Sequence, residues 1–327
     1  MKKKLYICNT YYHVFISLIK AIKDNNKSDI MITSDGMNNS LFSNNDLINN
    51  LEESKIFEKI ILFNYSAQET KSRNIIIKIF NRNYLAKKII KSNRYNFDEY
   101  DEINIFFERC LIGYIIRKER LYYNLIEDGT DYFINNYNRT HTKSRIKKIL
   151  KKMLNYDEIG ESKFVKSIEV NNAKGVVIQN KKIIEVPKQK LIENLSKEEK
   201  QIIFNVFLKE FKILKNGNLT LIITQPLSED KIVKFEKDKI LLYRKIIIEY
   251  ADNDNIIIKT HPRETTNYKA YFPNAYIIDD PFPIEILEFK DDIKFDKIIT
   301  ISSTSISLLN NSNEKIFLGW EWLDNNK

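Results

Sequence analysis

Short runs of branched apolar residues recur along this chain of 327 residues, and each run is followed by polar residues and then by a helical stretch. Strands that alternate with helices form parallel sheets, because a parallel connection is long enough to contain a helix. The pattern therefore predicts an α/β fold. The expected strands are Leu5–Cys8, Asp29–Thr33, Lys59–Phe63, Glu102–Phe107 and Leu121–Ile126 in the first half, and Leu219–Thr224, Asn255–Lys259, Ala275–Ile278, Lys297–Thr300 and Ile316–Leu318 in the second.

The alternation starts a second time after a charged helical segment, 197–214. Asn216, Gly217 and Asn218 form a typical helix stop, and a new strand begins at Leu219. A chain of this length also buries two hydrophobic cores of medium size more readily than one very large core. We therefore predict two Rossmann-like domains, an N-terminal one over residues 1–195 and a C-terminal one over residues 196–327.

Composition excludes several classes of protein. Hydrophobic residues make up 43% of the chain and aromatic residues 12%, which excludes a disordered protein. Cys8 and Cys110 lie in apolar segments without metal-ligand spacing, so we interpret them as free thiols in a reducing compartment. The first apolar run stops at Asn9, too early for a signal peptide, and no stretch reaches the roughly 18 apolar residues of a membrane span. A cytoplasmic protein is expected.

The net charge is +9, and the basic residues concentrate in segments 71–94 and 143–152. The first segment has the pattern of a basic amphipathic helix, and the second is a further candidate for a basic helix. Such a helix either is solvated or contacts anionic lipid, and contact would place the protein peripherally on the inner face of the membrane. A basic nucleic-acid-binding protein is an alternative from another class. Because the basic residues are not interleaved with a nucleic-acid-binding module, we expect no nucleic-acid partner.

The stretch Ile256-Ile257-Ile258-Lys259-Thr260-His261-Pro262-Arg263 changes abruptly from apolar to cationic. Open α/β sheets bind ligands at the carboxyl ends of their strands, which is where this change occurs. Pro262 favours an extended backbone at His261 and holds the imidazole at the strand end. A proton or hydrogen-bond donor for a phosphate fits this position. The simpler alternative is that a His-Pro pair only ends the strand.

Three other segments of the second half follow expected strands with polar residues. Gln225-Pro226-Leu227-Ser228 is a loop at a strand end, and Glu285 lies in the first turn of a helix that Pro281 and Pro283 introduce. The segment 302–305 offers four consecutive hydroxyl groups before a helix that we expect over Ile306–Leu309. Hydroxyls and backbone N–H groups at a helix start bind anions, although a single serine N-cap is the simpler alternative.

Two polar segments follow expected strands of the first half. Glu127-Asp128-Gly129 places two carboxylates and a glycine at a strand end, which suits a general base, although an Asp-Gly turn is the simpler alternative. The segment 9–13 is expected to be a loop at the same edge, before a helix that begins near Val14. Its His13 has no partner at triad spacing, and we interpret it as a loop residue that can contact substrate.

Taken in order, three of these motifs resemble those of bacterial sialyltransferases. That group has a pair of acidic residues followed by glycine, a Lys-x-His-Pro element and a Ser-Ser-Thr element. Here they are Glu127-Asp128-Gly129, Lys259-Thr260-His261-Pro262 and Ser302-Ser303-Thr304. In length and in its tyrosine-rich opening loop the chain is most similar to glycosyltransferase family 52, which includes lipooligosaccharide and capsule sialyltransferases. The resemblance spans residues 5 to about 322.

The resemblance implies a GT-B fold, in which two Rossmann-like domains face a central cleft and the second domain holds most of the donor, CMP-sialic acid. By the same resemblance Asp128 is the base that takes the proton of the acceptor hydroxyl, and Glu127 supports it or exchanges roles with it. His261 protonates or hydrogen-bonds the departing CMP phosphate. Ser302 and Ser303 bind the same phosphate.

Further residues acquire roles from the same comparison. Glu285 corresponds to a carboxylate for the ribose hydroxyls, and Lys259 to a residue beside the cytidine. The expected donor site is completed by Gln225, Pro262 and Thr304. The expected acceptor side consists of Asn9, Tyr11, Tyr12, His13 and Gly129.

The implied chemistry is consistent with these residue types. Loss of CMP from the sugar passes through an oxocarbenium-like state, so the protein must stabilise charge on the phosphate and supply a base on the opposite face. A single displacement of this kind inverts the anomeric carbon. The donor carries one phosphate and no pyrophosphate, so we expect neither a metal nor another cofactor. The expected acceptor is a galactose-terminated glycan or glycolipid.

Several alternatives stay open at this stage. Another nucleotide-sugar donor is compatible with the same fold and family. Asp230 and Asp238 rival Asp128 as the base. The pair Asp252 and Asp254 has the Asp-x-Asp pattern of metal-dependent glycosyltransferases, but it comes before a strand and not after one, at the edge away from ligands. The oligomeric state is open, and a homodimer is one alternative.

Overall fold

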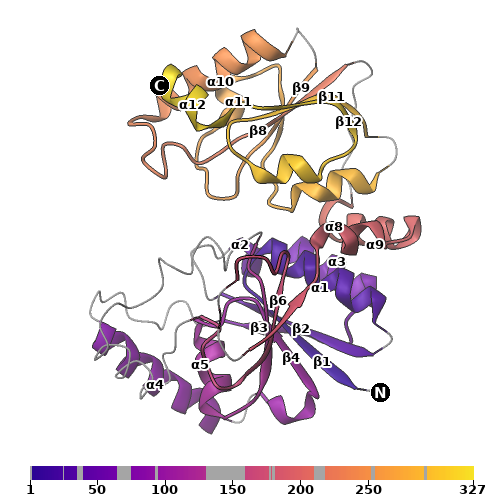
Figure 1. Ribbon diagram of the computed structural model, residues 1–327, viewed down its shortest axis with the longest axis vertical. Coiled ribbons are helices and arrows are strands. Elements are labelled where there is room, and N and C mark those ends of the chain that lie inside the picture. The colour runs from indigo at the N-terminus through magenta and orange to yellow at the C-terminus, as the bar shows by residue number, and fades with distance from the viewer. Residues whose placement is uncertain are drawn as a thin grey trace. The chain divides into compact units, whose positions relative to one another are not determined.

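A computed structural model describes residues 2–24, 26–34, 40–64, 75–92, 95–129, 159–176, 178, 181–209, 218–251, 255–290 and 293–327 (Figure 1). The chain forms two compact units, Met1–Glu199 and Lys200–Lys327. Three features predicted above lie outside the described residues: the second basic segment, most of the helix stop before Leu219 and the Asp-x-Asp pattern.

Unit 1, residues 1–199, contains a parallel sheet of seven described strands in the order β3-β2-β1-β4-β5-β6-β7. Because β1 is central and the chain moves first to one side and then to the other, the direction of winding reverses between β1 and β4. The strands are β1 Lys3–Cys8, β2 Lys27–Thr33, β3 Ile60–Phe63, β4 Glu102–Ile105, β5 Tyr123–Ile126, β6 Val165–Val170 and β7 Lys182–Glu185.

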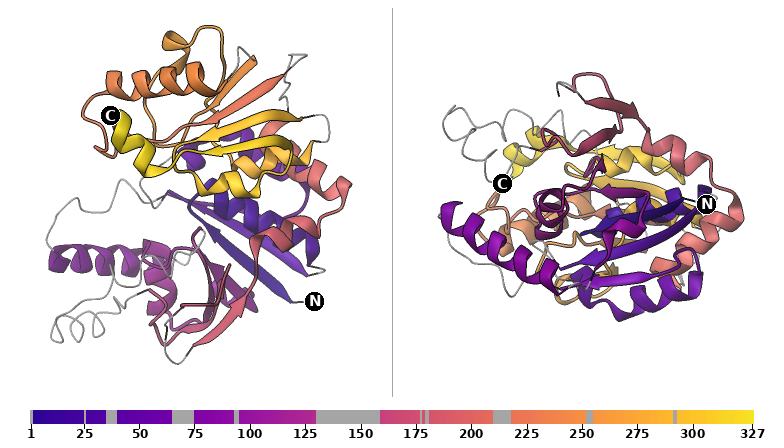
Figure 2. Two further views of the ribbon diagram at one scale, coloured as in Figure 1. Left: turned by 45° about the horizontal axis from the view of Figure 1, so that its top comes forward. Right: turned by 90° about the horizontal axis from the view of Figure 1, so that it is seen from below.

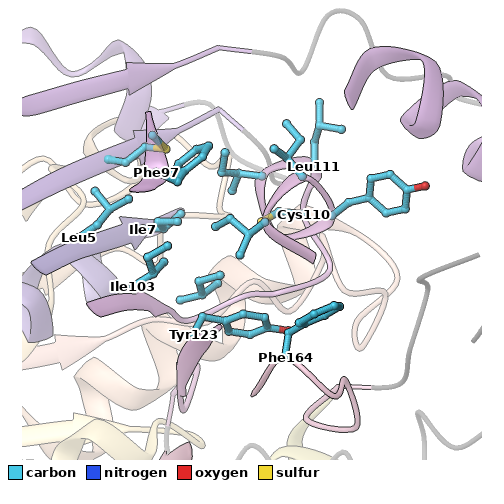
Figure 3. Close-up of a cluster of buried hydrophobic side chains, with 14 of the residues drawn as sticks. Leu5, Ile7, Phe97, Ile103, Cys110, Leu111, Tyr123 and Phe164 are labelled. Atoms are coloured by element: carbon cyan, nitrogen blue, oxygen red, sulfur yellow. The ribbon is translucent and has the colours of Figure 1, made fainter. Parts of the chain in front are cut away.

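Helices cover both faces of this sheet. The helix α1 (Tyr11–Lys23) packs on the face of Cys8, whose thiol contacts Ser17 of α1. On the other face, α4 (Ile75–Lys91) and α5 (Leu111–Lys118) enclose the core in Figure 3, where Leu5, Ile7 and Ile103 point toward the helices. The other helices in the described part of unit 1 are α2 Ser40–Ser43, α3 Asn45–Ser54, the 3₁₀ helix η1 Phe97–Glu99 and α8 Lys188–Glu193. The helix α9, Lys197–Leu208, continues into unit 2.

Unit 2, residues 200–327, contains a second parallel sheet, in which five described strands follow the order β10-β9-β8-β11-β12. Here the winding reverses between β8 and β11. The strands are β8 Leu219–Ile223, β9 Asn255–Lys259, β10 Tyr276–Ile278, β11 Phe295–Thr300 and β12 Ser312–Phe317. One face is covered by α10 (Glu236–Tyr250), α11 (Tyr268–Tyr271) and α12 (Gly319–Asn326). The 3₁₀ helices η2 (Ile284–Phe289) and η3 (Thr304–Leu308) lie on the other (Figure 2).

The predicted α/β class is confirmed, since two Rossmann-like units in one chain are the composition of a GT-B fold. Two local predictions were wrong. The helix expected from Val14 begins at Tyr11, because the Thr10 hydroxyl accepts the backbone N–H of His13 and caps the helix there. The segment after Ser303 forms a short 3₁₀ helix that begins at Thr304, not an α-helix over Ile306–Leu309.

A buried polar cluster fixes the turn between β4 and α5. The Glu108 carboxylate accepts hydrogen bonds from the Tyr123 hydroxyl and the Gly160 N–H, while the Arg117 guanidinium donates to the Glu108 carbonyl at 2.7 Å. Both Glu108 and Arg117 are buried. At Gly113, a β-carbon would overlap that same Glu108 carbonyl, so only glycine fits.

We therefore predict that Gly113→Ala destabilises unit 1. Alanine normally favours a helix by up to ~1 kcal/mol over glycine, but steric overlap with buried backbone typically costs about 1–3 kcal/mol. The free energy of unfolding in urea should fall accordingly, whereas Lys87→Ala on the exposed face of α4 should change it by less than about 0.5 kcal/mol. An unchanged or increased stability of Gly113→Ala would contradict the steric argument.

Candidate active site

The strand register in unit 1 places the polar residues that follow β1, β4 and β5 at the same edge of the sheet. Ile7 of β1 is level with Ile105 of β4, and Ile105 is level with Leu125 of β5. The chain therefore leaves these three central strands together, and the residues after them meet at the carboxyl edge of the sheet. The reversal point between β1 and β4 lies at this edge, where open α/β sheets bind ligands.

At this edge Asp128 and His13 form a hydrogen-bonded pair. The Nε2 atom of His13 lies 2.7 Å from Oδ1 of Asp128. The His13 side chain is fully buried, whereas 31% of the Asp128 side chain is exposed. The loop reading of His13 was wrong, because this residue lies in the first turn of α1 and has a partner at the end of β5.

Glu127 has a different environment from its neighbour. Its side chain is buried and accepts the backbone N–H of Asn171 at 2.6 Å. Of the two predicted carboxylates, Asp128 is therefore the accessible one. Gly129 follows with a positive φ of 89° and open space around it, so glycine is used here for its backbone conformation.

The other predicted acceptor-side residues also lie at the start of α1. Asn9 donates from its side-chain amide to the Thr33 hydroxyl at 2.6 Å and is buried. Tyr11 is buried, and its hydroxyl accepts a hydrogen bond from Asn44 at 3.3 Å. Tyr12 is half-buried, with the Lys188 ammonium 5.1 Å from its ring centre.

In unit 2 the strand register also brings together polar residues that follow three neighbouring strands. Ile223 of β8 is level with both Lys259 of β9 and Thr300 of β11. Two residues further along each chain segment come Gln225, His261 and Ser302. Since neighbouring strands are ~4.8 Å apart, these residues lie along one edge of the sheet, with Gln225 between the other two.

Gln225 bridges the reversal point of this sheet. Its side-chain amide donates to the Thr300 hydroxyl at 2.9 Å, and its carbonyl oxygen accepts the backbone N–H of Ser302 at 3.1 Å. The backbone N–H of Ser303 is bound by the Thr300 hydroxyl at 3.2 Å. The N–H groups of Ser302 and Ser303 therefore already have protein partners, and these two half-buried residues offer an anion their hydroxyl groups.

A backbone hydrogen bond to Nδ1 orients the His261 ring. The Nδ1 atom accepts the backbone N–H of Arg263 at 3.1 Å, so in the neutral ring the proton is on Nε2. Burial, together with the positive charge of Arg263, lowers the pKa of His261 from its ordinary value. At neutral pH the ring is therefore uncharged and offers Nε2–H as a hydrogen-bond donor. This state fits hydrogen bonding to a phosphate, which is one of the two roles predicted for His261.

A buried ionic network that we did not predict supports the His261 turn. The Glu264 carboxylate accepts the backbone N–H of His261 at 2.8 Å, the Tyr268 hydroxyl at 2.6 Å and the Thr224 hydroxyl. The fully buried Lys239 ammonium lies 3.3 Å from Glu264 and 2.9 Å from both carboxylate oxygens of Glu229.

The second carboxylate of this network is strongly held in its charged form. Burial alone would disfavour the charge of Glu229, but the Thr265 N–H and Lys239 more than compensate and lower the pKa of Glu229 to about 2. The only sequence signal for this network is that Glu264 follows His261 by three residues, since its other members come from distant segments.

Lys259 is 3% exposed, and among the described residues no carboxylate lies within ion-pair distance of its ammonium. The ammonium donates to the Thr260 carbonyl at 2.8 Å and lies 4.7 Å from the centre of the Phe282 ring. Burial lowers the pKa of Lys259 to about 8, against the opposing effect of Asp280 and Asp279. A buried cation without an ion pair is costly, which is typical of a functional residue.

The remaining predicted donor residues occupy the same unit. Glu285 is buried in the first turn of η2. Pro262 is exposed in the turn after His261, and Thr304 begins η3. The two rival candidates for the base have other partners. Asp230 forms a bidentate salt bridge with Arg263 at 2.6 and 2.9 Å. Asp238 accepts the Phe235 N–H at 3.0 Å and caps α10.

No cluster of three or more metal-binding side chains occurs among the described residues. The groups of unit 2 that can bind an anionic ligand include the His261 ring, the Lys259 ammonium and the hydroxyls of Ser302 and Ser303. Such groups suit the stabilisation of an anionic leaving group, and in unit 1 a carboxylate that a histidine holds suits a general base.

Comparisons with known proteins identify the family. The family described as glycosyltransferase family 52 matches residues 108–318, which include the Asp128 and His261 motifs. An uncharacterized protein of Haemophilus influenzae is 31% identical over 229 residues, which is 68% of each chain. The chain belongs to glycosyltransferase family 52.

Solved structures with a partial likeness include two bacterial sialyltransferases. The GT-B domain of a sialyltransferase from Photobacterium damselae gives a TM-score of 0.49 at 12% identity, covering 96% of this chain and 90% of that one. An alpha/beta-galactoside alpha-2,3-sialyltransferase from Photobacterium phosphoreum gives 0.48 at 15% identity, covering 97% and 90%. A UDP-GlcNAc 2-epimerase from Methanocaldococcus jannaschii gives 0.47 at 14% identity, covering 100% and 91%. At these values the likenesses carry no argument about substrates.

The state of Lys259 leads to a test of stability against pH. A pKa lowered from 10.5 to about 8 corresponds to a cost on the order of 3 kcal/mol for the folded protein at neutral pH. Because Lys259→Met removes this cost and loses one hydrogen bond and the contact with Phe282, we expect a net stabilisation of about 1–2 kcal/mol at pH 7. Urea unfolding at several pH values measures it.

The pH dependence distinguishes this effect from better packing. Between about pH 8 and pH 10.5 the unfolded wild-type chain binds a proton at this lysine that the folded protein does not, so wild-type stability rises across that window. The advantage of Lys259→Met should therefore be largest below pH 8 and disappear before pH 10.5, above which the missing hydrogen bond and ring contact leave the variant less stable than wild type. The exposed Lys237→Met is the matched control. A variant less stable than wild type at pH 7 would refute the argument.

Proposed function

We propose that this glycosyltransferase is an inverting, metal-independent sialyltransferase. It moves sialic acid from CMP-sialic acid to a terminal galactose of a cell-surface glycan, lipooligosaccharide or capsule. Two observations carry the proposal. At the carboxyl edge of the unit 1 sheet, the Asp128 carboxylate is hydrogen-bonded to His13 and still accessible. At the carboxyl edge of the unit 2 sheet, His261 offers a neutral Nε2–H. The motifs at both places match those of bacterial sialyltransferases.

In the proposed reaction the acceptor hydroxyl oxygen forms a bond to the anomeric carbon of sialic acid, while the bond from that carbon to the CMP phosphate breaks. The proton of the hydroxyl passes to the Asp128 carboxylate, and the bonding electron pair leaves with CMP. His261 donates a hydrogen bond from Nε2–H to the phosphate, with the hydroxyls of Ser302 and Ser303 as further donors. This stabilises the charge that develops on the leaving group.

The remaining predicted residues complete the donor site in this proposal. The Lys259 ammonium supplies a positive charge beneath the nucleotide, and Glu285 binds the ribose hydroxyls. Both are buried, so they act at short range or after a small adjustment of the Phe282 segment. No metal is required, because the donor has a single phosphate.

The principal test is release of CMP from CMP-sialic acid by the purified protein in EDTA, with and without lactose. Release that lactose stimulates supports donor, acceptor class and metal independence. We expect Asp128→Ala to lower kcat by about 10²–10⁴-fold and His261→Ala by about 10²–10³-fold. Asp230→Asn is the control for the rival base and should retain most of the activity.

Other results would change the proposal in defined ways. Undiminished activity of His261→Ala would refute it, and activity that EDTA abolishes would refute metal independence. Absence of both release and CMP binding would favour another nucleotide-sugar donor. Thermal-shift comparison of CMP with UDP and ADP identifies that donor, because a nucleotide that binds only the folded protein raises Tm.

We also propose that α4 contacts an anionic membrane surface on the cytoplasmic side. Its face opposite the core carries Ile77, Phe80 and Tyr84, of which the two aromatic side chains are 67% and 66% exposed. The same face continues with the exposed Lys87, Lys88 and Lys91. Large apolar residues next to lysines on one helical face are complementary to the interface of an anionic bilayer. Within the described ranges, no helix is both long enough and apolar enough to cross a membrane.

Vesicle sedimentation tests this contact. The protein should sediment with vesicles containing phosphatidylglycerol but not with pure phosphatidylcholine, and added salt should weaken binding. The double variant Phe80→Ser, Tyr84→Ser should bind at least about tenfold more weakly, since each removes an apolar side chain worth ~1.5–3 kcal/mol of burial. Ile248→Ser, at an even more exposed apolar position in α10, is the control. Equal loss in both variants would contradict a specific role of α4.

A further inference from the structure

Buried contacts constrain the His13 side chain at the edge of the unit 1 sheet. Its ring stacks on Phe106 with the ring centres 4.4 Å apart and the planes at 10°. Its Nδ1 accepts the backbone N–H of Asn9 at 3.1 Å, and its own backbone N–H is bound by the Thr10 hydroxyl. The side chain is fully buried. Neither the position nor the tautomer of this ring can change without breaking buried contacts.

These contacts determine where the ring proton lies. An atom that accepts a backbone N–H has no proton of its own, so Nδ1 is unprotonated and the neutral ring carries its proton on Nε2. That atom is 2.7 Å from Oδ1 of Asp128. The ring therefore donates a hydrogen bond to one fixed oxygen of the carboxylate. The other oxygen, Oδ2, is left to accept a proton.

We propose that His13 is a positioning residue for the transfer reaction. By holding Oδ1 it fixes both side-chain torsions of Asp128 and so presents Oδ2 in one orientation to the acceptor hydroxyl. The inference rests on the proposed role of Asp128 as the base. General-base efficiency depends strongly on geometry, and a displacement of ~1 Å can cost about 10²-fold in rate.

The alternative assignment, with His13 as the base and Asp128 as its orienting partner, does not fit the geometry. His13 is fully buried, both ring nitrogens already have partners, and its Nε2 faces Asp128 and not solvent. The exposed member of the pair is the aspartate. The order of roles is thus the reverse of an Asp-His-nucleophile arrangement, in which the aspartate is buried and the histidine acts on the substrate.

A matched pair of variants isolates the donated hydrogen bond. His13→Gln and His13→Met are similar in size and flexibility, and both lose the stacking on Phe106 and the ring nitrogen that accepts the Asn9 N–H. Only glutamine retains an N–H group that can reach Asp128. We expect kcat of His13→Met to fall by about 100-fold, and kcat of His13→Gln to stay within about tenfold of wild type. The KM for the donor should be the same in both.

The same pair in an Asp128→Asn background supplies the control. Without the carboxylate, the glutamine and methionine variants should have equal residual rates. Equal losses in the Gln and Met variants with Asp128 intact would overturn the inference and show that His13 only supports the fold. Failure of the base assignment gives a different result, since Asp128→Ala would then remain active. Failure of the donor assignment leaves the wild type unable to release CMP.

A measurement on the wild-type protein covers the case in which neither variant folds. The chain has three histidines, so selective ¹⁵N labelling resolves the ring of His13. The inference requires a protonated Nε2 and an unprotonated Nδ1 at pH 7, with a change in the Nε2 signal in Asp128→Asn. The opposite tautomer would overturn it.

Discussion

Both sheets are parallel, and the rest of the molecule depends on that constraint. Parallel strands in register send all their carboxyl ends to one edge, so residues that follow different strands meet without any local sequence relation. Ile7, Ile105 and Leu125 are level in one sheet, and Ile223, Lys259 and Thr300 in the other. The candidate active-site groups lie just beyond these residues, which are backed by the buried cores.

The carboxyl edges of the two sheets each contain a histidine that is oriented in the same way, although the two histidines have different partners. In each, a histidine Nδ1 accepts a backbone N–H, which fixes the proton on Nε2. At one edge that proton binds Asp128, and at the other it is offered outward by His261. The His261 turn also rests on the buried network of Glu264, Lys239 and Glu229, in which the Lys239 ammonium pairs with both carboxylates. Charged groups are thus used in both units to set geometry.

The sequence was sufficient for the α/β class, for most strands and for the motifs that contain Asp128 and His261, because apolar periodicity and abrupt polar changes are local signals. It was insufficient for His13, whose partner is 115 residues away. It also could not show that Gln225 and Thr300 occupy the N–H groups of Ser302 and Ser303, or that Lys239 lies beneath the His261 turn. These relations arise only when strands from distant segments are placed side by side.

The hydrogen bond between His13 and Asp128 also links activity to folding. It joins the first helix to the end of the fifth strand, so the proposed base has its working geometry only after β1, β4 and β5 have assembled in register. Such non-local contacts form late and slowly in parallel sheets. A partly folded or locally opened chain therefore has the residues of the site without its geometry, and unit 1 acquires a competent base only when its sheet is complete.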